Sequence, residues 1–138
     1  MNTQVYLSQA ISFDRKSRNK LAEIERYREM ATSITVANKE DKIQSSGDYD
    51  KMGSMVSKMV DLEREVEYME SVRDKIIKQI ENLDDSDMYF VLYARYITNR
   101  RLADIRHDIP CSKTQIYRIH EDALSTFEKK YGDSYLEM

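Results

Sequence analysis

Residues 55–83 follow a strict heptad repeat, and this repeat constrains the fold more than any other feature of the chain. The spacing alternates between four and three residues, and eight of the nine positions are apolar. The positions are Met55, Met59, Leu62, Val66, Met69, Arg73, Ile76, Ile80 and Leu83. Such a run predicts one long helix that packs against another helix. We expect Arg73 to extend its charge to solvent or to pair with an acidic group on the opposing helix.

A second helical segment, at about 5–36, is a candidate partner for the first. Its apolar residues include Leu21, Ile24 and Ile34, at spacings that place them near one face. Polar residues between 12 and 17 interrupt this stripe, so the segment could begin as two pieces. The stretch 37–53 holds two of the three glycines and few apolar residues, which predicts a loop.

Two arrangements of these helices fit the pattern. In one, the first segment folds back onto the second as an intramolecular hairpin. In the other, 55–83 forms a coiled coil between two chains, which makes a homodimer. The two are compatible, because Val56 and Val60 widen the apolar face beyond a two-stranded seam.

Composition agrees with a helical protein. The chain has 138 residues with only three glycines and one proline, too few for a turn-rich β fold. We expect an all-α fold with a helical hairpin or coiled coil at 1–83 and a three-helix helix-turn-helix domain at 84–138. No apolar run is long enough to span a membrane, and from the residues at the start of the sequence we expect no export signal. The single cysteine, Cys111, suits a reducing cytoplasm.

The segment 84–130 reads as three helices joined by short connections. The first runs to about Ile97 and can be capped by Asp84, Asp85 or Ser86. The second covers 102–108, and a turn at 109–111 leads into the third. Ser112 can cap the third helix by accepting a hydrogen bond from a free N–H of its first turn.

The third helix has the features of a recognition helix. Its predicted buried stripe consists of Ile116, Ile119, Ala123, Leu124 and Phe127. The residues predicted to face DNA are Ser112, Lys113, Thr114, Gln115, Tyr117, Arg118 and His120, with Arg100 and Arg101 beside the flanking phosphates.

These residue types have distinct roles at a DNA surface. An amide such as Gln115 can bond adenine bidentately, while Arg118 or Lys113 can reach guanine or a phosphate. Ser112 and Thr114 suit contacts to the DNA backbone. We expect His120 to be a surface or phosphate-contacting group.

Here a resemblance to a known family appears. The segment looks like domain 4 of bacterial sigma factors, and the whole chain is similar to small phage and prophage regulators of Gram-positive bacteria, of the autolysin-regulatory and late-gene activator type. The matching residues are Leu92, Arg95, Tyr96, Leu102, Asp104, Ile105, Ser112, Ile116, Ala123 and Leu124. The resemblance implies a transcriptional regulator that binds double-stranded DNA.

The charge distribution agrees with this function although the net charge is −3. Residues 95–120 carry six Lys or Arg and only two Asp, and phosphates respond to the local potential. Two alternatives stay open: a DNA-packaging protein like the small subunit of phage terminases, and a module that binds RNA polymerase rather than DNA.

The sequence gives no sign of catalysis. His107, Cys111 and His120 lack a fourth ligand at metal spacing, so we expect no metal and no cofactor. Helix capping accounts for the acidic group at 84–87 more simply than a catalytic role. We therefore expect the chain not to be an enzyme.

Overall fold

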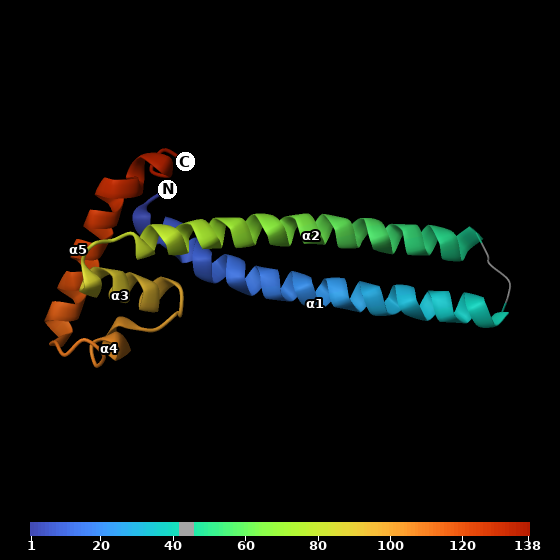
Figure 1. Cartoon of the computed structure of the whole chain (residues 1–138), viewed down its shortest axis with the longest axis horizontal. Coiled ribbons are helices and arrows are strands. Elements are labelled where there is room, and N and C mark those ends of the chain that lie inside the picture. Colours follow the sequence, from blue (N-terminus) through green and yellow to red (C-terminus); the bar gives the residue numbers. More distant parts are fainter. Residues whose placement is uncertain (42–45) are drawn as a thin grey trace. The chain divides into compact units, whose positions relative to one another are not determined.

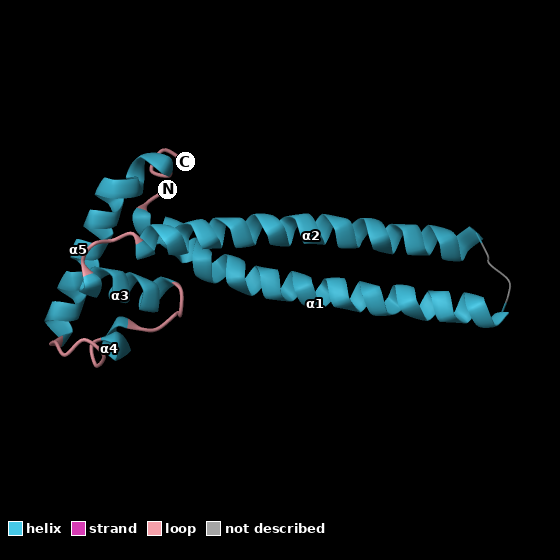
Figure 2. Ribbon diagram, viewed as in Figure 1, coloured by secondary structure: helices cyan, strands magenta, loops and turns pink. Residues whose placement is uncertain are grey.

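The chain is built from α-helices. The computed structural model describes the backbone of residues 1–41 and 46–138 and the side chains of residues 1–34 and 50–138. The elements in order are α1 (Thr3–Asp41), α2 (Ser46–Glu81), α3 (Ser86–Tyr96), α4 (Leu102–Ile105), α5 (Lys113–Tyr131) and a short 3₁₀ helix, η1 (Gly132–Ser134). These described residues form no strand (Figure 1, Figure 2). The predicted all-α fold is therefore confirmed.

The two long helices continue further than the sequence predicted. The helix α1 is unbroken across residues 12–17 and extends to Asp41, and α2 already begins at Ser46. Most of the loop predicted at 37–53 is therefore helical, and 42–45 lie outside the described residues. Two properties account for the error. The stretch holds several good helix formers, among them three lysines, one alanine and one glutamate, and glycine costs a helix only about 1 kcal/mol.

The described residues divide into two compact units, which differ from the expected domains at 1–83 and 84–138. One unit comprises Met1–Asp14 and Ser71–Met138, and the other comprises Arg15–Glu70. We call them the terminal unit and the hairpin unit. The boundary moves because the start of α1 and the end of α2 carry apolar side chains that are buried in the core of the terminal unit.

In the hairpin unit, α1 and α2 pack side by side in opposite directions (Figure 1). Lys20 Nζ lies 2.5 Å from Glu65 Oε2, and Lys58 Nζ lies 5.7 Å from the ring centre of Tyr27. Lys20 and Tyr27 are seven residues apart on α1, and their partners Glu65 and Lys58 are seven residues apart in the reverse direction on α2. The two helices are therefore antiparallel. The heptad positions from 55 to 69 are buried or half-buried. The intramolecular hairpin predicted from the sequence is confirmed for these residues.

Arg73 pairs within the terminal unit. Its Nε lies 4.0 Å from Asp14 Oδ1 of α1, and the side chain is only 27% exposed. The predicted acidic partner is therefore supplied by the opposing helix of the same chain. The Nε atom is buried and has no hydrogen-bond partner among the described residues.

The main core of the terminal unit joins the two ends of the chain. The ring of Tyr6 stacks on that of Tyr135 with 4.1 Å between centres, and both contact Phe127 at about 6 Å. Two hydrogen bonds fix the phenols: Tyr6 donates to Gln79 Oε1 at 2.6 Å, and Thr3 Oγ1 lies 2.8 Å from the hydroxyl of Tyr135. Burial raises the pKa of both tyrosines.

A smaller core holds α3, α4 and α5 together. It consists of Val91, Ala94, Ile105 and Ile116, all buried. The helix α4 has four residues rather than the predicted seven, and 106–110 continue as turns. The backbone after α4 tightens into three-residue turns, in which the N–H groups of His107 and Asp108 donate to the carbonyl oxygens of Asp104 and Ile105. Among described residues, the single positive φ outside glycine is that of Asn99, at 56°, in the connection between α3 and α4.

Candidate nucleic-acid interface

The helix α5 begins with a capping box. Ser112 Oγ accepts from the N–H of Gln115 at 3.1 Å, and the N–H of Ser112 donates to Gln115 Oε1 at 3.0 Å. The predicted cap at Ser112 is therefore confirmed. The second hydrogen bond was not predicted, and it occupies the carbonyl oxygen that a bidentate contact with adenine would need.

One face of α5 is buried and anchors the helix. Ile116, Ala123, Leu124 and Phe127 are buried, and Ile119 is half-buried. The predicted stripe is confirmed, so α5 is fixed on its inner side by two hydrophobic clusters.

The opposite face of the first two turns of α5 is open to solvent. Lys113, Thr114, Gln115, Tyr117 and Arg118 are all exposed, and 47% of the Tyr117 side chain is accessible. The structure thus brings five of the predicted contact residues together on one rigid surface. Below we call this set the α5 face.

His120 is not on the α5 face, and its prediction as a surface or phosphate-contacting group is wrong. Only 4% of the residue is exposed, and Nε2 lies 2.8 Å from the hydroxyl of Tyr96 on α3. Burial lowers the pKa of His120, opposed in part by Glu121, and burial raises the pKa of Tyr96 to about 12. A local signal existed, because His120 lies four residues after Ile116 and three before Ala123, on the buried stripe.

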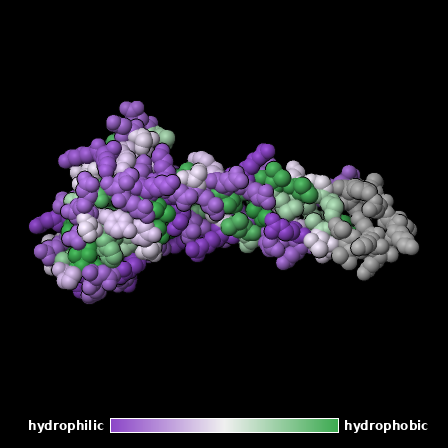
Figure 3. Space-filling view, viewed as in Figure 1, coloured by the Kyte–Doolittle hydropathy of each residue, from purple (hydrophilic) through white to green (hydrophobic). Residues whose placement is uncertain are grey.

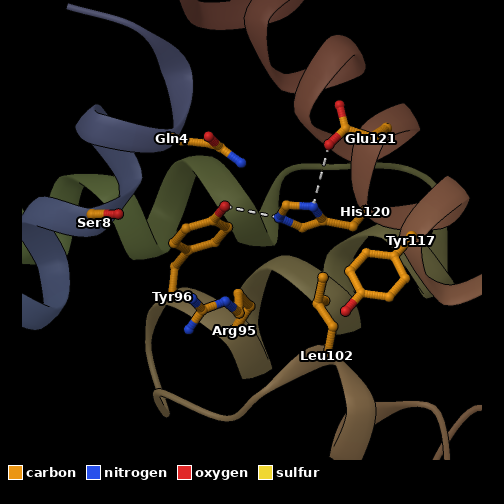
Figure 4. Close-up of a pocket in the computed structure, with 8 residues that line it drawn as sticks. All are labelled: Gln4, Ser8, Arg95, Tyr96, Leu102, Tyr117, His120 and Glu121. Atoms are coloured by element: carbon orange, nitrogen blue, oxygen red, sulfur yellow. Dashed lines mark hydrogen bonds and ion pairs between the residues drawn. The ribbon is translucent and has the colours of Figure 1, made fainter. Parts of the chain in front are cut away.

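A polar pocket of about 340 Å³ lies beside this histidine (Figure 4). It is lined by Gln4, Ser8, Arg95, Tyr96, Leu102, Tyr117, His120 and Glu121. Both Arg95, which was not among the predicted contact residues, and Tyr117 of the α5 face line this pocket. Its other wall comes from the first two turns of α1, and no local pattern in the sequence predicts that neighbour.

Arg100 and Arg101 lie at the start of α4, and both make ion pairs. Arg100 Nη2 is 2.5 Å from Asp108 Oδ2, and Arg101 Nε is 3.2 Å from Asp104 Oδ2. Arg101 remains 82% exposed, whereas Arg100 is 38% exposed. Of the two predicted phosphate contacts, Arg101 is therefore the more accessible.

The comparison with protein families matches residues 37–128 to a family described as "Protein of unknown function (DUF1492)". The match covers more than half of the chain. The chain belongs to the DUF1492 family. No curated protein and no solved structure matches it. The DUF1492 match includes every predicted contact residue from Arg100 to His120, and it leaves out the start of α1 that packs in the terminal unit.

Within the DUF1492 region, residues 95–120, which include the α5 face, have an excess of basic over acidic residues. The two acidic residues of 95–120, Asp104 and Asp108, are each paired with an arginine. Lys113 and Arg118 make no ion pair within the described part of the chain, so their charges are available to an anionic partner. Local charge of this kind attracts phosphates.

The described residues give little evidence for a metal site, a reactive cysteine or a membrane span. Among them, no group of three or more His, Cys, Asp or Glu side chains is arranged to hold a metal ion. Cys111 is half-buried and packs against the smaller core. None of the described helices is long and apolar enough to cross a membrane.

Proposed function

We propose that this chain is a sequence-specific DNA-binding transcriptional regulator, in which α5 enters the major groove of double-stranded DNA. The observation that carries the proposal is the α5 face. It presents Lys113, Thr114, Gln115, Tyr117 and Arg118 to solvent on a capped helix whose other side is buried. A recognition helix needs both properties, exposed polar groups and a rigid support.

The arrangement of α3, α4 and α5 supports the same proposal. The short α4 precedes α5 and packs with it on the smaller core, as the first helix of a helix-turn-helix does. Two of the residues that carry the resemblance to sigma factor domain 4, Ile105 and Ile116, belong to this core. A role like that of the phage and prophage regulators fits these features.

The roles within the α5 face follow from chemistry. Lys113 and Arg118 suit guanine or phosphate, and Thr114 suits the DNA backbone. Gln115 keeps its amide NH₂ for a base edge while its carbonyl oxygen serves the capping box. Arg101 suits the flanking phosphates.

A selection of duplexes from a random-sequence library, followed by fluorescence anisotropy, tests the proposal. The parent chain should enrich one motif, and Arg118→Ala should weaken binding to it by roughly 1–3 kcal/mol. The salt dependence of DNA binding should also be smaller in Arg118→Ala than in the parent, by about one released counterion, if Arg118 contacts a phosphate. Lys129→Ala is the matched control, because it removes one positive charge from the far end of the same helix.

Two results contradict the proposal. One is the absence of salt-dependent binding to any duplex, which would favour a module that binds RNA polymerase instead. The other is an equal effect of Arg118→Ala and Lys129→Ala, which would indicate that net charge rather than the α5 face governs binding.

A further inference from the structure

One residue of the α5 face exposes an aromatic ring. Lys113, Thr114, Gln115 and Arg118 are polar or charged, whereas Tyr117 is aromatic and 47% exposed. Within α5, which the structure describes completely, Tyr117 is the one exposed large hydrophobic residue. Hydrophilic residues (purple) cover most of the terminal unit on the side drawn in Figure 3. Single exposed rings are ordinary on protein surfaces, so the meaning of this one depends on its place on the helix.

Tyr117 lies in the part of α5 that would face base edges. It is the fifth residue of the helix, four residues after Lys113 and next to Arg118. Side chains four residues apart are neighbours on one face of a helix, so the ring of Tyr117 lies one turn beyond Lys113. The N-terminal residues of a recognition helix are those that contact base edges in the major groove. If α5 is the recognition helix, this ring is therefore within reach of the bases.

The surroundings of the ring favour an uncharged partner over a phosphate. Arg95 and Glu121, which carry opposite charges, line the same pocket as Tyr117 (Figure 4). Leu102, a half-buried residue of α4, lines it as well. Because the two opposite charges largely cancel, a phosphate is attracted more strongly to the unpaired cations of the α5 face. An apolar group of a base is the better partner for the ring.

The 5-methyl group of thymine is the apolar group that a side chain meets in the major groove. The faces of the bases are stacked in a duplex, so only their edges are accessible there. Guanine, adenine and cytosine present hydrogen-bonding groups at these edges, whereas thymine presents a methyl group beside its carbonyl oxygen. A ring that packs against this methyl group removes apolar surface of both from water.

We propose that Tyr117 is a specificity-determining residue, whose ring packs against the 5-methyl group of one thymine in the bound DNA. The inference rests on the proposed function and adds the base that this side chain selects. The contact uses the ring and needs no hydrogen bond from the phenol hydroxyl. Thr114 is the competing residue, because a threonine methyl group on the same helix face can make the same contact.

Replacement of thymine by uracil tests the contact, because it removes only the methyl group and keeps the base pair. Each thymine of the selected motif, on either strand, is replaced in turn, and fluorescence anisotropy measures the affinity of the parent chain. Replacement of one particular thymine should weaken binding about four-fold, the effect expected for one buried apolar carbon. Equal affinity for every uracil duplex, or a selected motif without thymine at any position, overturns the proposal.

Three variants identify the side chain that makes the contact. Tyr117→Ala should bind the thymine duplex more weakly than the parent and should no longer distinguish thymine from uracil. Tyr117→Phe should keep the preference for thymine, because the ring is retained. Thr114→Ser is the matched control, since it removes the competing methyl group, and it should keep the preference as well. A preference that survives in Tyr117→Ala, or that is lost in Tyr117→Phe or in Thr114→Ser, overturns the proposal.

The outcomes separate this inference from the proposed function. Salt-dependent binding to one selected motif, without an effect of uracil at any position, would overturn the thymine contact and leave the proposed function standing. If no motif is selected, both are overturned. Circular dichroism checks that each variant keeps the helix content of the parent, and the uracil comparison on the parent chain needs no variant.

Discussion

The Tyr96 hydroxyl lies 2.8 Å from Nε2 of His120, and this hydrogen bond joins α3 to α5 inside the terminal unit. The two rings also stack, with 5.7 Å between their centres. Because His120 is on the buried side of α5, it helps to hold the helix whose other side forms the α5 face. The pair therefore holds in place the helix that we propose as the recognition helix.

Stability should decrease as the pH falls through about 6.5, the ordinary pKa of histidine. Burial lowers the pKa of His120 in the folded chain, so the unfolded chain takes up a proton first. The free energy of unfolding should decrease by up to about 1.4 kcal/mol per pH unit and level off below the folded-state pKa. At pH values above 7.5 the histidine contributes no pH dependence, because it is neutral in both states.

Urea unfolding of two variants at several pH values between 5.5 and 7.5 checks this pH dependence of the free energy of unfolding. His120→Gln should remove the decrease near pH 6.5. His107→Gln should keep it, because His107 is exposed and is the only other histidine of the chain. An unchanged pH profile in His120→Gln would show that another group is responsible.

Gln115→Glu should separate the capping of α5 from the proposed contact with DNA. A glutamate at this position can still accept from the N–H of Ser112, and negative charge is favourable at a helix N-terminus. The free energy of unfolding should therefore change by less than about 0.5 kcal/mol. DNA binding should weaken markedly, because a carboxylate on the α5 face repels phosphates.

Gln115→Ala is the comparison for that experiment. It should weaken DNA binding and also lose the hydrogen bond from the N–H of Ser112, at a cost of about 1 kcal/mol in stability. The cap at Ser112 remains, because it accepts from the backbone N–H of residue 115. Thermal unfolding and anisotropy on the selected duplex measure the two effects. Full DNA affinity in Gln115→Glu would mean that this part of α5 does not approach DNA.

Leu7→Ala should destabilise the terminal unit although residue 7 is far from the helix-turn-helix in sequence. Leu7 is 0% exposed and belongs to the same core as Phe127. Truncation of a buried leucine costs about 2–5 kcal/mol. Val5→Ala, at a position that is 50% exposed, should change stability by less than about 0.5 kcal/mol. Chemical denaturation with a fluorescence probe on α5 would measure both, and equal small effects would contradict the packing of α1 in this unit.

Arg73→Met should leave the free energy of unfolding unchanged or raise it by about 1 kcal/mol. The Nε of Arg73 is buried without a hydrogen-bond partner in the described structure, and Asp14 is at 4.0 Å. An apolar residue of similar length avoids the desolvation of the guanidinium and fits the heptad pattern. A loss of more than about 2 kcal/mol, measured by urea titration, would show that the pair with Asp14 is strongly stabilising.

The sequence determined the local features of this protein. Heptad spacing located the seam of the hairpin, and polar residues before apolar periods predicted the cap at Ser112. For α3 they left Asp84, Asp85 and Ser86 as candidates, and the structure shows that Asp85 accepts from the N–H groups of Asp87 and Met88. Two further features could have been predicted from the sequence. The pattern Ser112 to Gln115 is a capping-box spacing, and the position of His120 follows the buried stripe. Such features depend on residues within one or two helical turns, so they are encoded locally.

Only the tertiary structure decided the long-range relationships. It placed Leu7 and Tyr6 in a core with Phe127 and Tyr135, which moved the boundary between the two units. It also filled the seam at 55–69 with α1 of the same chain, which the heptad alone left open between a hairpin and a dimer. The physical reason is that an apolar stripe specifies that a face must be covered but carries no information about which segment covers it.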